Sequence, residues 1–163
     1  MVRVSELMGT WAEALGLSDW DRCRWRAAGL LHDALREVAP DVLRPKVPPN
    51  QSSLPGPMLH GPAVAERLRV HSVLDGELLL ALAYHTVGHP SLGMLGRALY
   101  AADFLEPGRA FLPEWRAGLR ARMPEELDAV TRDIVGARVT YLVDRGFDLP
   151  ADTVGFWNVL VVV

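Results

Sequence analysis

The sequence predicts an all-α fold, a bundle of helices within a single domain at residues 1–163. Apolar residues recur at spacings of three and four along most of the chain, as on one face of an amphipathic helix. Glycines and prolines interrupt this pattern at intervals that suit helices of ordinary length. No segment shows the alternation of apolar and polar residues that predicts a paired strand. At 163 residues, half of them hydrophobic, the chain is long enough to bury one core.

Two helices are expected at the start of the chain. The first has an apolar face at Val4, Leu7, Met8, Trp11, Ala14 and Leu15, and Gly16 ends it. The second begins with Ser18 or Asp19 as N-cap. Its stripe is formed by Trp20, Arg24, Ala27, Ala28 and Leu31. We expect His32 and Asp33 to lie near the C-terminal end of this second helix.

A proline-rich segment follows at about residues 40–57. It contains six prolines together with Asn, Gln and Ser, a composition that does not sustain a helix. The sequence therefore predicts a long loop, and loops of this length in compact domains often form lids or walls of sites.

The remaining chain is again predicted to be helical. We expect helices at about 61–70, 75–86 and 92–105, and a long one from about Glu125 to Arg145 that ends at Gly146. The apolar segment at about 150–163 could pass for a strand but has no partner strand. We therefore expect it to be an apolar tail that packs on the bundle.

Composition excludes some classes of function. The formal charge of −3 argues against a protein that neutralises a nucleic-acid backbone. No apolar run reaches the roughly 20 residues that span a bilayer. Cys23 is the single cysteine and no secretory signal is seen, so a cytoplasmic location is expected.

Four segments carry residues that are expensive to bury alone. His32 and Asp33 are adjacent, His60 begins one predicted helix, His85 ends another, and Asp103 lies in an apolar stretch. Divalent cations such as Fe, Mn, Co or Zn accept imidazole nitrogen and carboxylate oxygen together, and a shared cation removes these penalties at once. Taken singly, each residue has an ordinary structural explanation. Their order on successive helices is much more specific.

The order His-Asp, His, His, Asp resembles the HD-domain superfamily of metal-dependent phosphohydrolases. The segments "AGLLHDALR", "HGPAVAERL", "ALAYHTVGHPSLGML" and "LYAADFLEPGRAF" are similar to the YqeK family of symmetrical bis(5'-nucleosyl)-tetraphosphatases, which split diadenosine tetraphosphate into two ADP. The resemblance extends from about residue 4 to the tail. It implies an all-helical HD-domain bundle with a divalent metal, usually iron in this family, with Mn or Co as alternatives.

Matched position by position, the resemblance assigns roles to individual residues. His32, Asp33 and Asp103 match metal ligands, and Asp33 and Arg36 are the expected catalytic residues. The remaining positions match substrate-phosphate contacts: His60, His85, Thr86, Gly88 and Arg109. In other HD proteins, the histidines that match His60 and His85 bind a second metal. His71 and His89 match no ligand position.

The implied chemistry needs no covalent intermediate. The metal acidifies a bound water and polarises a phosphoryl oxygen, while cations and imidazoles absorb charge on the departing ADP. The implied substrate is a dinucleoside polyphosphate or a nucleotide. No nucleic acid or membrane partner is expected, and the sequence does not decide between a monomer and a homodimer.

One position departs from the family pattern. The family's first metal ligand is a histidine that would fall just before Met1, so three protein ligands are expected from this chain. Either the natural start lies upstream, or another residue or water completes the site, or the activity is impaired. Two alternatives to the leading activity therefore remain: a hydrolase of mononucleotides, and a degenerate HD module that binds nucleotide without turnover.

Overall fold

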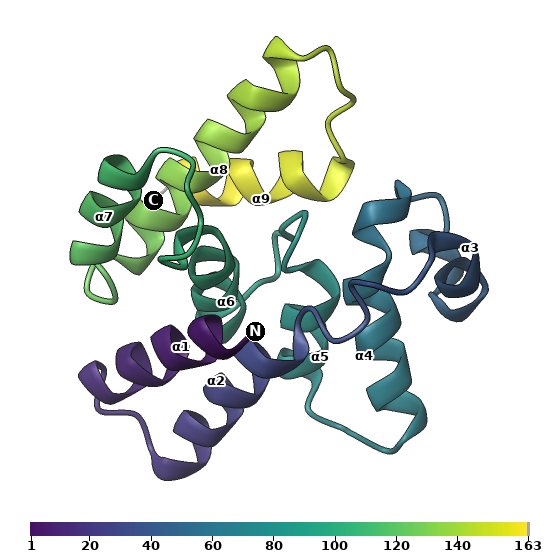
Figure 1. The fold of residues 1–163 in the computed structure, drawn as a ribbon, viewed down its shortest axis with the longest axis horizontal. Helices are drawn as coiled ribbons and strands as arrows, with labels where there is room; N and C mark the ends of the chain where they lie inside the picture. Colours follow the sequence, from purple (N-terminus) through teal and green to yellow (C-terminus); the bar gives the residue numbers. More distant parts are fainter. Residues whose placement is uncertain (163) are drawn as a thin grey trace.

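The structure, a computed structural model, describes residues 1–162 and confirms the all-α prediction. Within these residues it has α-helices and short 3₁₀ turns, and no strand (Figure 1). The helices are α1 Val2–Ala14, α2 Asp19–Leu31, α3 Pro40–Leu43, α4 His60–Val70, α5 Gly76–Tyr84, α6 Met94–Leu105, α7 Pro113–Ala121, α8 Leu127–Asp144 and α9 Ala151–Val161. The first two, the three central and the long late helix all lie where the sequence predicted them, within a few residues.

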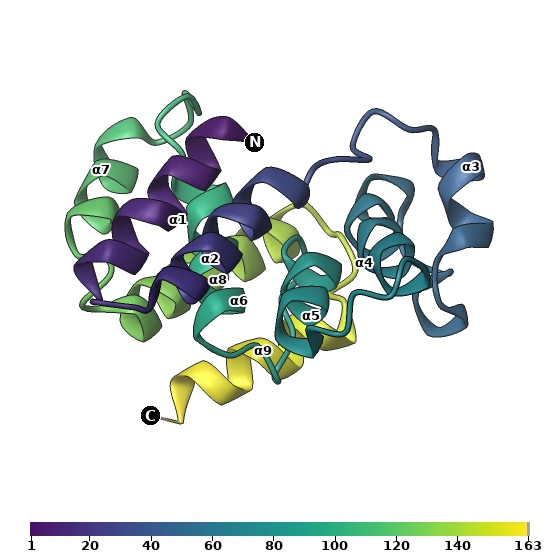
Figure 2. The ribbon, with the colours of Figure 1, turned by 90° about the horizontal axis from the view of Figure 1, so that it is seen from below.

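Helix α6 forms the centre of the molecule. It packs against α1, α2, α5, α7 and α8, and its buried residues include Leu95, Leu99 and Leu105. The two views in Figures 1 and 2 show α1 and α2 lying side by side against α6, with α4 and α5 on the opposite side from α7. An alanine-rich stretch, Ala98, Ala101 and Ala102, allows close packing around this helix. Asp103 on α6 therefore lies near the middle of the fold.

The proline-rich segment is more ordered than the sequence predicted. It contains α3 and three 3₁₀ turns, at Arg44–Lys46, Pro49–Gln51 and Gly56–Met58, instead of an unstructured loop. Each of these elements has a proline in its first turn, where the missing N–H costs nothing and the fixed φ favours helical geometry. Leu43 and Val47 form a small second core with Leu59 and Ala63.

Two helices of the later chain were not predicted. The first is helix α7, between Pro113 and Ala121, with Pro113 in its first turn. The tail at 150–163 is helical over Ala151–Val161, because Thr153, Phe156 and Leu160 recur at helical spacing and bury one face. Val163 lies outside the described residues.

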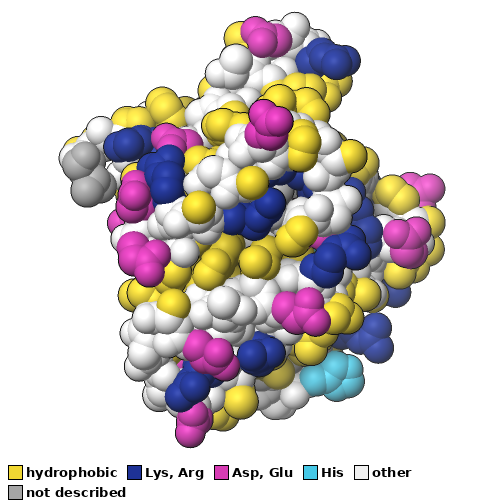
Figure 3. Space-filling model, turned by 60° about the vertical axis from the view of Figure 1, so that its left-hand side comes forward, with side chains coloured by type: hydrophobic (Ala, Val, Ile, Leu, Met, Phe, Trp, Pro, Cys, Tyr) yellow, Lys and Arg dark blue, Asp and Glu magenta, His cyan; other side chains and the backbone are white. Residues whose placement is uncertain are grey.

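Smaller details also differ from prediction. Helix α2 ends at Leu31, so His32 is its C-cap and Asp33 lies in the turn that follows. Trp20, predicted on the apolar stripe, is exposed, and Trp25 is buried in its place. Among residues 1–162 no helix has both the length and the apolar composition to cross a membrane. On the face in Figure 3, acidic and basic side chains are interspersed, without a broad field of one sign.

Candidate metal centre

Five of the predicted site residues come together where four helices meet. His32 caps the end of α2 and Asp33 follows it, His60 is the first residue of α4, His85 caps the end of α5, and Asp103 lies within α6. The three histidines are buried, whereas the two carboxylates retain about a quarter of their side-chain exposure. The three histidines lie at helix ends, so the chain turns away beside each of them and leaves the space between the side chains free.

All three histidines are oriented in the same way. Each uses Nδ1 to contact the carbonyl oxygen three residues earlier, at 2.8 to 2.9 Å: His32 with Gly29, His60 with Pro57 and His85 with Leu82. A carbonyl oxygen only accepts, so Nδ1 carries the proton and donates. In the neutral form of each ring, Nε2 therefore carries the lone pair, and this atom faces the cluster. This tautomer is the one that binds a metal through Nε2.

Asp33 connects the two halves of the cluster. Its Oδ1 lies 3.0 Å from His60 Nε2 and 3.8 Å from His85 Nε2. Its Oδ2 lies 3.4 Å from His32 Nε2, which is in turn 3.6 Å from Asp103 Oδ1. Two groups with metal-binding composition result, Asp33–His60–His85 and His32–Asp33–Asp103, each with ligand atoms within 4.8 Å of one another. Asp33 belongs to both.

The donor atoms fit a bound cation. His60 Nε2 and His85 Nε2 are 3.0 Å apart, yet both rings already place a proton on Nδ1. Two lone pairs at this distance, beside an Asp33 carboxylate, repel unless a proton or a metal ion lies between them. Imidazole nitrogen with carboxylate oxygen is the ligand set of Fe, Mn, Co or Zn. The residues present therefore suit a divalent metal.

The same electrostatics shift the pKa values of the cluster. Burial alone lowers the pKa of His32, but the adjacent carboxylates of Asp103 and Asp33 outweigh it and raise that pKa to about 9. Burial raises the pKa of Asp103, yet His32 and Arg109 outweigh it and hold that pKa at about 2. Burial lowers the pKa of the His85 imidazole. The carboxylate of Asp103 is thus ionised and the imidazole of His85 neutral at pH 7, as metal binding requires, whereas a metal ion that binds His32 must displace the proton on its Nε2.

Arg109 reaches the cluster from the segment after α6. Its guanidinium donates a hydrogen bond to Asp103 Oδ1, and its Nε lies 4.0 Å from Glu106 Oε1. Glu106 is held mainly by Arg3 of α1, at 2.5 Å, and by the Gly108 N–H. Arg3 could not be identified from local sequence, because it lies 103 residues from its partner. The buried Glu106 side chain therefore links Arg3 of α1 to Arg109 at the cluster.

The other predicted site residues lie at different places. Thr86 Oγ1 is 3.2 Å from His85 Nε2, and Arg36 Nη1 is 4.0 Å from Asp33 Oδ1, so both border the cluster. Gly88 has a φ of +77°, and a Cβ there would come within 2.3 Å of Phe156 on α9. Backbone conformation and packing explain the glycine. A role of Gly88 in substrate binding stays a prediction.

Two residues that the sequence did not single out support the cluster. A Cβ on Gly61 would come within 2.6 Å of the Leu82 carbonyl and 3.0 Å of the His85 ring, so this glycine lets α4 and α5 approach until His60 and His85 meet. Thr153 of α9 donates to the Val87 carbonyl at 2.7 Å and fixes the turn after His85. For Gly61, the one indication in the sequence was its position directly after His60.

Comparison with known proteins defines the class of this chain. The family model described as "HD domain" matches residues 1–133, and the chain belongs to this family. A crystal structure from Clostridium acetobutylicum, described as a predicted HD superfamily hydrolase involved in NAD metabolism, superposes with a TM-score of 0.84. It covers 99% of this chain and 86% of its own at 23% identity, which shows the shared fold.

Three curated relatives that match this chain share one name. A protein of Bacillus subtilis named bis(5'-nucleosyl)-tetraphosphatase, symmetrical, is 32% identical over 52% of this chain and 48% of its own length. A protein of the same name from Staphylococcus aureus is 30% identical over 66% of this chain and 57% of its own. A third, from Halalkalibacterium halodurans, is 26% identical over 64% and 55%. The matched segments span about half of the length of these relatives.

Proposed function

We propose that this protein is a metal-dependent phosphoanhydride hydrolase, with symmetrical cleavage of diadenosine tetraphosphate to two ADP as its reaction. The observation that carries the proposal is the position of Asp33 within two overlapping groups of metal-binding composition. The names of the three curated relatives support this choice of substrate.

The chain's own residues have distinct parts in this proposal. His32, Asp33 and Asp103 hold the divalent metal, for which Fe is the first choice and Mn or Co the alternatives. His60 and His85 bind substrate phosphate, or a second metal together with Asp33. When bound, the metal supplies a Lewis acid that activates water and neutralises charge on a phosphoryl group.

Cationic side chains near the cluster stabilise the charge of the substrate. Arg109 already reaches the Asp103 carboxylate, so its guanidinium lies within range of any phosphate held beside that residue. Arg36, half exposed and 4.0 Å from Asp33, is placed to contact a more distant phosphate oxygen. The buried histidines are fixed by backbone carbonyls and need no rearrangement during turnover.

A product assay tests the proposal. The full chain is incubated with Fe, Mn or Co and with a panel of dinucleoside polyphosphates and mononucleotides, and the products are separated by chromatography. ADP as the single adenine product from diadenosine tetraphosphate supports the proposal. AMP with ATP from that substrate, or turnover confined to mononucleotides, contradicts it. Nucleotide binding without turnover under every metal condition indicates a binding module.

A further inference from the structure

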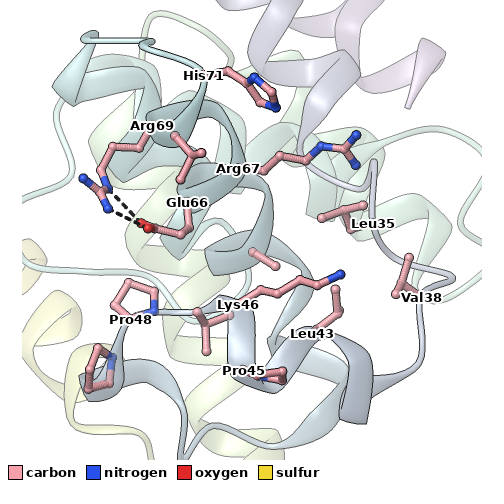
Figure 4. A pocket seen from close by; sticks show the side chains of 14 residues that line it. Leu35, Val38, Leu43, Pro45, Lys46, Pro48, Glu66, Arg67, Arg69 and His71 are labelled. Carbon is pink, nitrogen blue, oxygen red and sulfur yellow. Dashed lines mark hydrogen bonds and ion pairs between the residues drawn. The ribbon is translucent and has the colours of Figure 1, made fainter.

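A cavity of about 960 Å³ lies between α4 and the proline-rich segment, apart from the metal-binding cluster (Figure 4). Its apolar lining includes Leu43, Val47 and Ala63 of the small second core described above, and Leu35 and Val38, which pack against that core. This volume lies in the range of pockets that hold ligands of nucleotide size. The prolines of the segment, including Pro45 and Pro48, make one wall rigid.

The charges at this cavity are positive although the protein as a whole is acidic. Lys46, Arg67 and Arg69 line it with a single carboxylate, Glu66. Arg69 holds Glu66 through two hydrogen bonds of 2.6 and 2.8 Å. Lys46 and Arg67 have neither an ion pair nor a side-chain hydrogen bond to any residue within 1–162.

Figure 4 shows how these side chains are directed. Lys46 and Arg67 extend toward the side on which Leu35 and Val38 lie, while Arg69 turns the other way to its partner. Two free cations therefore flank an apolar surface. A multiply charged phosphate attached to an apolar ring system satisfies both features at once.

The cavity is built on the same elements as the cluster. His60, Ala63 and Arg67 stand at i, i+3 and i+7 of α4 and share one face of this helix. Leu35 and Val38 lie in the turn that follows His32 and Asp33. A ligand in the cavity thus contacts the two segments that position Asp33 and His60.

We propose that this cavity binds an organic phosphate of nucleotide size, with its apolar part on Leu35, Val38 and Ala63 and its phosphates at Lys46 and Arg67. Two sources supply such a ligand: the half of a dinucleoside polyphosphate that lies away from the metal, or a free nucleotide. The first source rests on the function proposed above, whereas binding itself does not.

Site-resolved binding tests the proposal without turnover. ADP is titrated into the isotopically labelled, metal-free full chain, and backbone amide signals are followed by NMR. We expect shifts within residues 35–47 and 63–71, and a loss of affinity of about tenfold or more in a Lys46→Ala, Arg67→Ala double variant. Both side chains are exposed, so the variant should fold normally.

A charge-matched control removes two other exposed arginines, Arg26→Ala with Arg145→Ala, and should bind ADP as the parent does. Shifts confined to the cluster, or equal affinity in the parent and the Lys46–Arg67 variant, overturn the proposal.

A second titration, with diadenosine tetraphosphate, separates the two sources. If one substrate molecule spans both places, cavity and cluster signals titrate with one Kd, and the double variant raises KM about tenfold with kcat unchanged. If the ligand is a free nucleotide, the two regions titrate separately and KM is unchanged. Each result keeps the cavity as a phosphate site. Absence of ADP release in the product assay would remove the proposed function and leave the ADP titration unaffected.

Discussion

The metal-binding cluster and the neighbouring cavity share α4 and the turn after α2, yet their charges are organised in opposite ways. In the cluster, buried imidazoles and two carboxylates direct lone pairs toward one another within 3.0 to 3.8 Å. In the cavity, the exposed cations Lys46 and Arg67 face an apolar surface and contact no anion of residues 1–162. The first arrangement suits a cation, and the second suits the anionic ligand proposed above.

This difference shows how one short segment serves two kinds of ligand. The turn after α2 directs Asp33 toward the histidines, whereas Leu35 and Val38 face the proline-rich segment. The cluster depends on buried, mutually oriented groups, so single substitutions should have large effects there. The cavity depends on exposed charges, whose removal should leave the fold intact.

The largest effect is expected from Asp33→Ala, which removes the residue shared by both groups of metal-binding composition. Loss of residues that only orient metal ligands typically costs about 10- to 100-fold, so loss of a shared ligand should lower ADP release by more than about 100-fold. Metal content, measured by atomic emission after dialysis, should fall in parallel.

A matched control for this variant is Asp128→Ala, which removes an exposed carboxylate that pairs with Arg97. It should retain metal and activity. If Asp33→Ala keeps its metal and its rate, the cluster is not the metal centre.

Arg109 shares a feature with each region. It is a partly exposed cation, like those of the cavity, but it lies at the edge of the cluster and is already paired with the Asp103 carboxylate. We expect Arg109→Ala to lower kcat/KM for diadenosine tetraphosphate by about 10- to 100-fold, since one charge-assisted contact to phosphate is lost. The melting temperature should change little, because this side chain is 42% exposed. Arg109→Lys should recover part of the rate.

Arg122→Ala, at a partly exposed arginine paired with Glu126 and Asp133, serves as the control for Arg109. Unchanged turnover together with a melting temperature many degrees lower would make Arg109 a structural residue.

Much of the fold could be predicted from the sequence, because apolar spacing depends on local periodicity. The predicted helix starting near residue 61 and the one ending near residue 86 placed His60 and His85 at helix ends, as the structure confirms. The tail packs on the main core through Phe156 and Leu160, as expected, but its helix was not predicted because its valines obscured the helical spacing of Thr153, Phe156 and Leu160. The prediction of a long loop at about residues 40–57 was wrong, because a proline in a first turn can begin a helical element as readily as a proline elsewhere ends one.

The candidate site also has parts that the sequence predicted and parts that it did not. Residue types and their order indicated the five residues of the cluster, because few arrangements satisfy buried histidines and carboxylates together. The link from Arg3 to Glu106 and the cavity at Lys46 and Arg67 depend on tertiary packing between distant segments. Neither has a local signal in the sequence.

Gly61→Ala tests whether close approach of α4 and α5 is what joins the two halves of the cluster. Its added Cβ would meet the Leu82 carbonyl and the His85 ring, so the helices must separate by a few tenths of an ångström or more. All ligands remain, yet we expect about tenfold lower activity and weaker metal retention, because catalytic geometry tolerates little displacement. Gly118→Ala, at a helical glycine with open space around it, should be neutral. Full activity of Gly61→Ala would show that the cluster adjusts freely.

The smallest effect on activity should come from Asp75, a carboxylate partner of Arg24, which is a fully paired cation in contrast to Lys46 and Arg67. Arg24 on α2 contacts Asp21, Asp75 and Glu77, and Asp75 also caps α5 by accepting from the Leu78 N–H at 3.0 Å. The guanidinium of Arg24 is the main cause that holds the pKa of Asp75 below its usual 3.8. A lowered carboxyl pKa stabilises the fold above the unfolded-state value, and this stability is lost as the pH falls through the folded-state pKa.

Asp75→Asn should therefore cost about 1 to 2 kcal/mol of unfolding free energy at pH 7, and the gap to the parent should narrow as the pH falls below 3.8. Urea unfolding at several pH values measures both quantities, and activity and metal content should stay unchanged because the residue lies outside the cluster. A gap that is independent of pH would show that the Asp75 charge beside Arg24 does not stabilise this end of α5, since Asn can still accept the hydrogen bond from the Leu78 N–H.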